Sequence, residues 1–65
     1  MQVEIIFNSG IIKILDLRVK DKNAELVIIK ELRRLHELGT TKVIDTETSV
    51  VMLNFKEVAY IEIPK

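Results

Sequence analysis

The segment that most constrains the fold is VVMLNFKEVAYIEI, which runs from Val50 to Ile63 and holds few side chains suited to water. β-Branched and aromatic residues of this kind favour strands over helices. In its first part, Val50 to Leu53, neither of the two alternating faces is polar. That pattern is typical of a central strand, or of a strand covered on both sides. We therefore expect the segment to supply sheet structure rather than a ligand groove.

The chain has more apolar side chains than a domain of its size can easily bury. Of its 65 residues, 24 are isoleucine, valine or leucine, and none is cysteine. A domain this small hides only about 60% of the surface that its unfolded chain exposes, and no disulfide can add stability. We predict that residues 1–65 form one domain that self-associates, because contact between copies would cover the surplus.

The apolar runs predict neither export nor membrane insertion. The start, MQVEII, lacks the basic stretch and long apolar run of a signal peptide, and the longest uninterrupted apolar runs have four residues. A membrane-spanning helix needs about 20. We expect a cytoplasmic protein without membrane contact, and the lack of cysteine fits a reducing compartment.

The N-terminal residues predict a β-hairpin. Apolar and polar residues alternate up to Phe7, and Asn8-Ser9-Gly10 is a turn sequence in which the glycine can take a positive φ. If Phe7 pairs with Ile11, alternate residues define two faces of the hairpin. The face expected to meet the core consists of Val3, Ile5, Phe7, Ile11, Leu15, Leu17 and Val19, interrupted by Lys13.

Three isoleucines on the opposite face of this hairpin form a candidate interface. Ile6, Ile12 and Ile14 share that face with polar residues such as Gln2 and Glu4. An apolar patch with polar neighbours marks a contact site. Two interpretations remain open: another subunit covers the patch, or a loop or the terminal strands of the same chain do.

The middle of the chain predicts a helix. The apolar residues recur at spacings of three and four, as one helix face requires; they are Ala24, Ile28, Leu32 and Leu35. Asp21 or Asn23 can accept hydrogen bonds from the first free N–H groups. Gly39 is expected to end the helix, as glycine commonly does.

Strand patterns return after the helix. We expect strands at Lys42 to Asp45 and Ser49 to Asn54 around a polar turn, and another at Val58 to Ile63, before Pro64. The predicted fold class is α+β, in the order β-β-α-β-β-β. It consists of an antiparallel sheet of 4–5 strands packed on one helix.

The sequence predicts no catalytic, cofactor or metal site. His36 is the only histidine, the residue type best suited to acid-base chemistry at neutral pH, and it falls at the boundary between the apolar and charged helix faces. Ser9 and Ser49 lie beside predicted turns, where serine commonly bonds the backbone. Two glycines and no cysteine leave no phosphate-binding loop and no thiolate metal site. We predict a non-catalytic interaction module that binds a protein partner.

Nucleic-acid binding is the alternative function. The basic residues that could contact phosphates are Lys20, Lys22, Lys30, Arg33 and Arg34. Asp21, Glu31 and Glu37 interleave with them, and ten acidic residues balance ten basic ones over the whole chain. A protein that binds phosphate backbones usually has a basic excess, so a protein partner is favoured.

Two resemblances accompany these patterns. A hairpin and helix followed by Leu53-Asn54-Phe55 and Val58 is similar to the later half of a LytTR-type DNA-binding domain. The positions where such a domain carries basic and hydroxyl residues hold Thr48 and Ser49 here, with no arginine, so the likeness does not imply DNA binding. The VxIxFxxG hairpin and the closing ΦxNΦxxVxYIE, where Φ is apolar, resemble very short bacterial and phage proteins. That resemblance covers nearly the whole chain and implies architecture more than activity.

Overall fold

Five antiparallel strands and one helix follow the predicted order β-β-α-β-β-β in the computed structural model, which describes residues 1–64. The elements are β1 (Gln2–Phe7), β2 (Ile12–Asp16), α1 (Lys22–Leu38), β3 (Thr41–Asp45), β4 (Val50–Asn54), a 3₁₀ turn η1 (Phe55–Glu57) and β5 (Val58–Glu62). The predicted α+β class and element order are confirmed.

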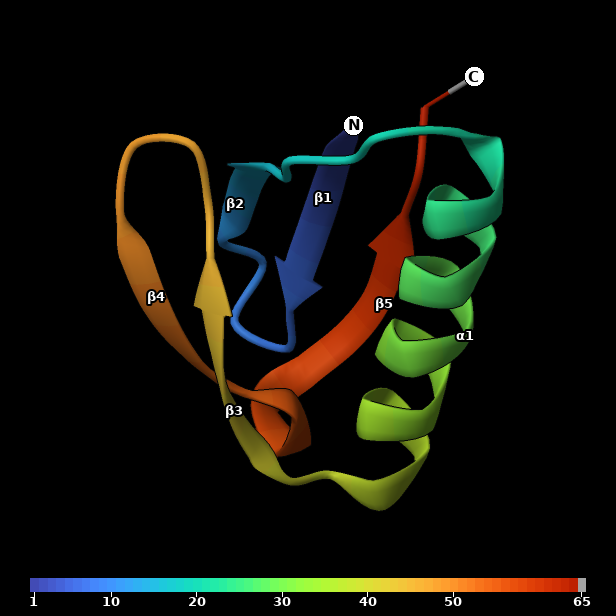
Figure 1. Cartoon of the computed structure of the whole chain (residues 1–65). Helices are drawn as coiled ribbons and strands as arrows, with labels where there is room; N and C mark the ends of the chain where they lie inside the picture. Colours follow the sequence, from blue (N-terminus) through green and yellow to red (C-terminus); the bar gives the residue numbers. More distant parts are fainter. Residues whose placement is uncertain (65) are drawn as a thin grey trace.

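The strands form two sheets where the sequence predicted one. One sheet has the order β2-β1-β5 and the other is the β3-β4 hairpin, as Figure 1 shows. The separation begins at η1, where the side chain of Asn54 accepts a hydrogen bond from the N–H of Lys56 at 3.1 Å. This turn redirects the chain, so that β5 leaves β4 and pairs with β1 instead.

The N-terminal hairpin has the predicted register. The N–H of Phe7 donates to the carbonyl of Ile11 at 2.9 Å, and Ile6 lies opposite Ile12. Gly10 has a φ of 91°, which a residue with a Cβ rarely adopts. Local turn chemistry therefore determines which faces of β1 and β2 meet the core.

The helix is held by a cap at each end. Asp21 accepts a hydrogen bond from the N–H of Ala24 at 2.8 Å, so Asp21 is the cap, whereas Asn23 lies within the first turn. Gly39 has a φ of 64° and its N–H donates to the carbonyl of Leu35. The helix begins at Lys22, two residues before the predicted start.

The core lies between the two sheets and the helix. Its buried members come from both sheets, α1, η1 and the segment after β2: Val3, Ile5, Leu15, Leu17, Leu32, Leu35, Leu53, Phe55 and Val58. Phe7 and Val19 are partly buried against it. Ile11, predicted to face the core, is exposed, because it lies in the turn before β2, beyond the paired part of the hairpin.

The prediction of a central strand at Val50 to Leu53 is wrong for the single chain. β4 pairs only with β3 and is therefore an edge strand. Val50 is 65% exposed and Met52 74% exposed. The strand that follows it in the chain, β5, belongs to the other sheet. An apolar strand is thus left uncovered on one face and along one edge.

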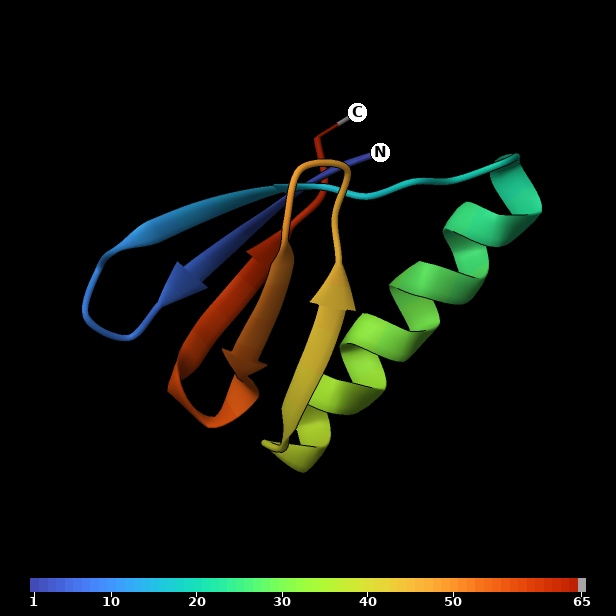
Figure 2. The same ribbon diagram turned by 60° about the vertical axis from the view of Figure 1, so that its left-hand side comes forward.

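α1 lies beside the open edges of two strands. Figure 2 shows it next to β3, and Figure 1 shows it next to β5. The residues that line two surface grooves support this placement, since one groove contains side chains of α1 and β5 and the other contains side chains of α1 and β3. Leu32 lines both grooves, and so lies at the centre of the helix contact.

Candidate interaction surfaces

The three predicted interface isoleucines meet on the outer face of the β2-β1-β5 sheet. Ile6 lies opposite Ile12 in the hairpin, and Ile14 lies opposite Glu4. Ile12 is 58% exposed and Ile14 56% exposed, whereas Ile6 is only 8% exposed. The register thus brings the three residues together, and the buried side chain of Ile6 lies beside the two more exposed isoleucines.

β5 adds Tyr60 to this surface, which the sequence interpretation missed. Tyr60 lies directly opposite Ile6 and is exposed. The alternative in which terminal strands of the same chain cover the isoleucines is therefore correct in part, since β5 flanks Ile6 but leaves Ile12 and Ile14 open. We call the four residues Ile6, Ile12, Ile14 and Tyr60 the outer apolar patch.

Acidic side chains border the outer apolar patch at one end. Glu4 lies opposite Glu62 across the β1-β5 pair, and Asp16 lies on the same face at the end of β2. Like charges directly opposite each other in a sheet are unfavourable. A partner that brings a lysine or arginine to this border would relieve that repulsion.

The chain exposes more surface than a compact protein of its mass. Its accessible surface is 4898 Å², whereas a globular monomer of 7.5 kDa exposes about 4250 Å². The excess, roughly 650 Å², is close to the ~800 Å² that each partner buries in a stable protein interface. Separation of the strands into two small sheets explains the excess, because each sheet leaves one face without cover.

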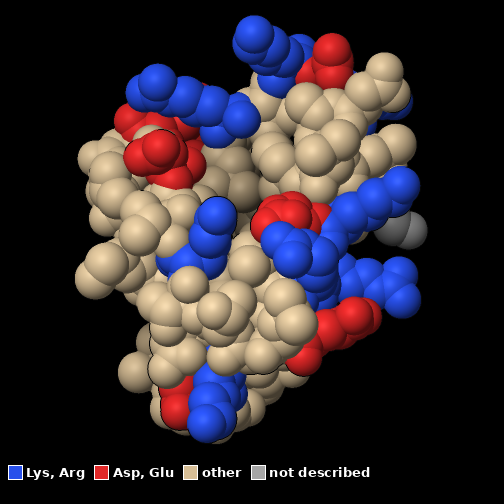
Figure 3. Space-filling model, turned by 60° about the horizontal axis from the view of Figure 1, so that its bottom comes forward, with Lys and Arg blue, Asp and Glu red and all other residues tan. Residues whose placement is uncertain are grey.

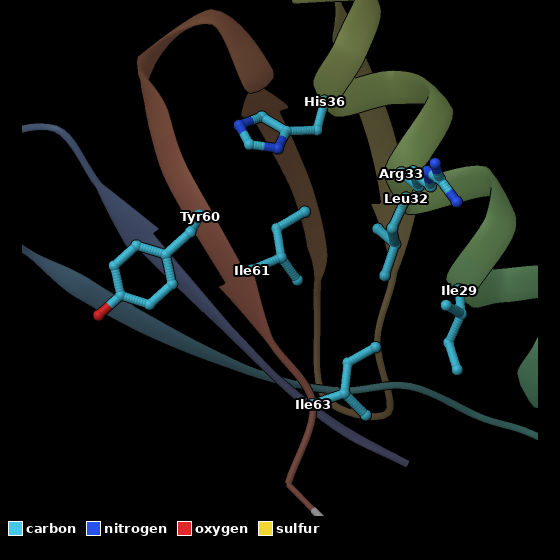
Figure 4. A pocket seen from close by; sticks show the side chains of 7 residues that line it. All are labelled: Ile29, Leu32, Arg33, His36, Tyr60, Ile61 and Ile63. Atoms are coloured by element: carbon cyan, nitrogen blue, oxygen red, sulfur yellow. The ribbon is translucent and has the colours of Figure 1, made fainter.

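The groove between α1 and β5 contains the only histidine. Its volume is about 300 Å³, and it is lined by Ile29, Leu32, Arg33, His36, Tyr60, Ile61 and Ile63. Figure 4 shows the helix side chains on one side of it and the β5 isoleucines on the other. His36 Nε2 lies 2.8 Å from the carbonyl oxygen of Val58. His36 therefore links the helix to the edge of β5.

The predicted basic contact residues lie on or just before α1, where acidic partners neutralise two of them. Arg34 donates to Glu31 at 2.9 Å, and this hydrogen bond lowers the pKa of the Glu31 carboxyl below its ordinary value. Arg33 lies 3.3 Å from Glu37. Figure 3 shows Lys and Arg side chains interleaved with Asp and Glu on the face in view. Lys20, Lys22 and Lys30 are exposed and complete a mixed rather than a purely basic surface.

The potential metal ligands of the described residues are dispersed, and the two serines lie in turns. Within residues 1–64, no group of three or more metal-ligating His, Cys, Asp or Glu side chains comes together. Ser49 bonds to Thr46 in the β3-β4 turn, and Ser9 lies in the β1-β2 turn, where its hydroxyl lies 3.5 Å from the N–H of Ile11. Both serines thus have backbone or turn partners. No helix in this part of the chain is long and apolar enough to cross a membrane.

Comparison with models of known protein families, with curated proteins and with solved structures finds no match to this chain.

Proposed function

We propose that this chain is a non-catalytic interaction module, which self-associates and binds a protein partner. The observation that carries the proposal is the outer apolar patch, where two half-exposed isoleucines and a tyrosine surround a buried isoleucine on one sheet face. Aromatic and aliphatic side chains at the centre and charged groups at the border are the usual composition of a protein interface. The excess accessible surface supports the same function.

The mechanism would be burial of apolar surface with orientation set by charge. Ile12 and Ile14 would supply the apolar contact, while Glu4 and Glu62 would select a partner with basic residues at its rim. A cytoplasmic location belongs to the same proposal, because a chain without cysteine needs no oxidising compartment to fold.

Replacing Ile12 with lysine tests the outer apolar patch. We expect Ile12→Lys to weaken self-association by about 30-fold or more, the effect of losing an interface residue worth about 2 kcal/mol. The measurement is light scattering after size exclusion over a range of concentrations. The expected result is a lower mass than that of the unaltered protein at the same concentration, because the copies lose the contact made by the patch.

Ile11→Lys is the matched control for this change. Ile11 is adjacent in sequence, has the same side chain and is also exposed, but it does not belong to the patch. We expect the control to leave the mass unchanged. An unaltered protein that is a single chain at every concentration would contradict self-association, and an oligomer insensitive to Ile12→Lys would place the contact elsewhere.

The alternative function is nucleic-acid binding through the basic residues of the loop and helix. One observation favours it: Lys30, Arg33 and Arg34 lie on the exposed surface of one helix. If it is correct, affinity for DNA or RNA falls steeply as salt rises, and an Arg33→Glu/Arg34→Glu double change abolishes binding. Fluorescence anisotropy at low salt measures the binding of DNA or RNA. No binding under these conditions would contradict the nucleic-acid function.

A further inference from the structure

Among the described residues, the two sheets end in four outer strands, which are β2, β5, β3 and β4. The open edge of such a strand presents unpaired N–H and C=O groups that attract other strands. Natural proteins protect these edges with inward-pointing charges, with covering elements or with bonds from loops. The four edges of this chain differ in how far they are protected.

The edge of β2 is protected in two ways. Lys13 alternates with Leu15 and lies opposite Ile5, so it places a charge on the core side of an edge strand. The N–H of Glu47, in the β3-β4 loop, donates to the carbonyl of Asp16 at 3.0 Å. A strand that approached β2 would have to displace this bond and bury the lysine.

α1 flanks the edges of β5 and β3 across the two grooves. On the β5 side, His36 contacts the carbonyl of Val58. On the β3 side, Lys42 shares the inner face of the hairpin with Leu53, and together with α1 side chains it lines the groove of about 220 Å³. Both edges therefore have a neighbouring element and a polar group in place.

The edge of β4 has none of these protections. Its sequence, VVMLN, contains no charge and no proline. Figure 1 shows β4 at the margin of the molecule, with β3 on one side and no ribbon of the described chain beyond it. An exposed apolar edge strand of this kind is a template for pairing with another strand.

The hydrogen bonds at both ends of the hairpin show which backbone groups face this edge. The N–H of Thr46 donates to Ser49, and the N–H of Phe55 donates to Thr40. Because antiparallel pairs alternate between bonded and non-bonded positions, Val51 and Leu53 bond to β3. The N–H and C=O groups of the alternate residues, Val50, Met52 and Asn54, then face outward.

We propose that β4 pairs with β4 of a second copy in antiparallel orientation, so that the two hairpins form one continuous four-stranded sheet. The register that uses every outward group is centred on Met52. In this register the two Met52 residues face each other across the twofold axis, and Val50 faces Asn54 of the other copy. The pairing would give β4 a second neighbouring strand, as expected for a strand whose two alternating faces are both apolar.

Charge identifies a second copy as the occupant. Asp45 ends β3 opposite Val50, Glu47 lies in the loop before β4 at the tip of the hairpin, and Lys56 follows the end of β4. Antiparallel pairing places the start of each strand beside the end of the other, so the acidic tip of one copy approaches Lys56 of the other. Within the paired strands no charged side chains meet, because β4 has none.

This inference rests in part on the proposed self-association, but it concerns another surface. The outer apolar patch belongs to β2-β1-β5, and β4 belongs to the other sheet. Pairing through β4 therefore leaves the patch open for a protein partner. The two contacts can be tested independently.

Single cysteines test the register directly, because the chain has no cysteine of its own. Facing residues in an antiparallel pair have Cα atoms about 5.5 Å apart, within the range that a disulfide spans. We expect Met52→Cys to form a disulfide-linked dimer under mild oxidation, seen on a non-reducing gel. Val50→Cys is the matched control. Val50 is on the same strand and face and is also exposed, but in this register it faces Asn54 of the other copy, four positions away from the other Val50.

The outcomes of the crosslinking experiment are distinct. Linking of Met52→Cys at least tenfold faster than Val50→Cys supports the proposed register. Equal rates would show random collision, and no linking would show that β4 edges do not meet; either result overturns the proposal.

A second measurement separates this contact from the outer apolar patch. Met52→Pro removes an N–H that faces the open edge, and proline is accepted at such positions of edge strands. In an Ile12→Lys background we expect a dimer that Met52→Pro converts to a single chain, with Met52→Lys as a second variant should the proline disturb folding. A monomeric Ile12→Lys protein would overturn the β4 pairing while leaving the patch as the contact.

Discussion

Replacing Phe55 with alanine is expected to lower the free energy of unfolding by about 3–5 kcal/mol, the usual range for a buried phenylalanine. Phe55 is 1% exposed and is among the largest fully buried side chains. It opens η1, and its N–H bonds to Thr40 at 2.9 Å, so it fills the core where the chain passes from one sheet to the other. A domain of this size has a total stability of about 3–10 kcal/mol, so the loss would leave much of the protein unfolded.

Urea denaturation followed by far-UV circular dichroism measures this effect. All variants must be compared at one protein concentration, because association raises the apparent stability of the folded state. Ile11→Ala is the control, since Ile11 is a large apolar residue that is exposed, and we expect it to change the free energy of unfolding by less than about 0.5 kcal/mol. Similar midpoints for the two variants would contradict the assignment of Phe55 to the core.

Leu32→Ala is expected to lower the free energy of unfolding by about 2–5 kcal/mol. Leu32 is buried in the core cluster and lines the grooves on both sides of the helix contact. Its loss leaves a cavity where α1 meets both sheets, and the helix cannot move towards one sheet to fill the cavity without leaving the other. The destabilisation should therefore lie in the upper part of the range.

Leu38→Ala provides the matched comparison for Leu32→Ala. Both residues are leucines of the same helix, but Leu38 is exposed, and we expect its truncation to cost less than about 0.5 kcal/mol. Thermal unfolding of the two variants at equal concentration gives the difference. A Leu38 variant as unstable as the Leu32 variant would show that the other side of the helix is also covered, for instance by another subunit.

The features that the sequence predicts correctly depend on local chemistry. The β1-β2 hairpin follows from the turn at Gly10 and from alternating residues, and the helix follows from its spacing and from the caps Asp21 and Gly39. In each of these the interacting residues lie close together in the chain. The turn or cap then determines the register without help from the rest of the fold.

The features that the sequence does not predict depend on contacts between distant residues. Nothing in the spacing of Val58 to Glu62 indicates that β5 pairs with β1, which lies at the other end of the chain. The side chain of Asn54 that stabilises η1 is a short-range signal, but it does not specify where the next strand goes. The division into two sheets, and the exposure of β4, follow from this one long-range pairing.

The sequence also predicted only part of the outer apolar patch. Alternation places Ile6, Ile12 and Ile14 on one face, and the β1-β2 register confirms it. The addition of Tyr60 and the burial of Ile6 both come from the neighbouring β5, whose position only the fold reveals. Whether this surface is a contact with a partner stays a prediction.

If copies of this chain pair through β4 as proposed, the position of α1 beside β3 and β5 limits how far that pairing can extend. In the proposed dimer, with the helix docked, pairing through β4 would be complete with two chains, because the remaining open edge of each hairpin, that of β3, lies beside α1. Release of the helix would free one further strand in each sheet, and each dimer could then add subunits without end. Under the proposed pairing, the side chains that anchor the helix would limit the growth of fibres, and conditions that detach the helix should turn the dimer into a filament.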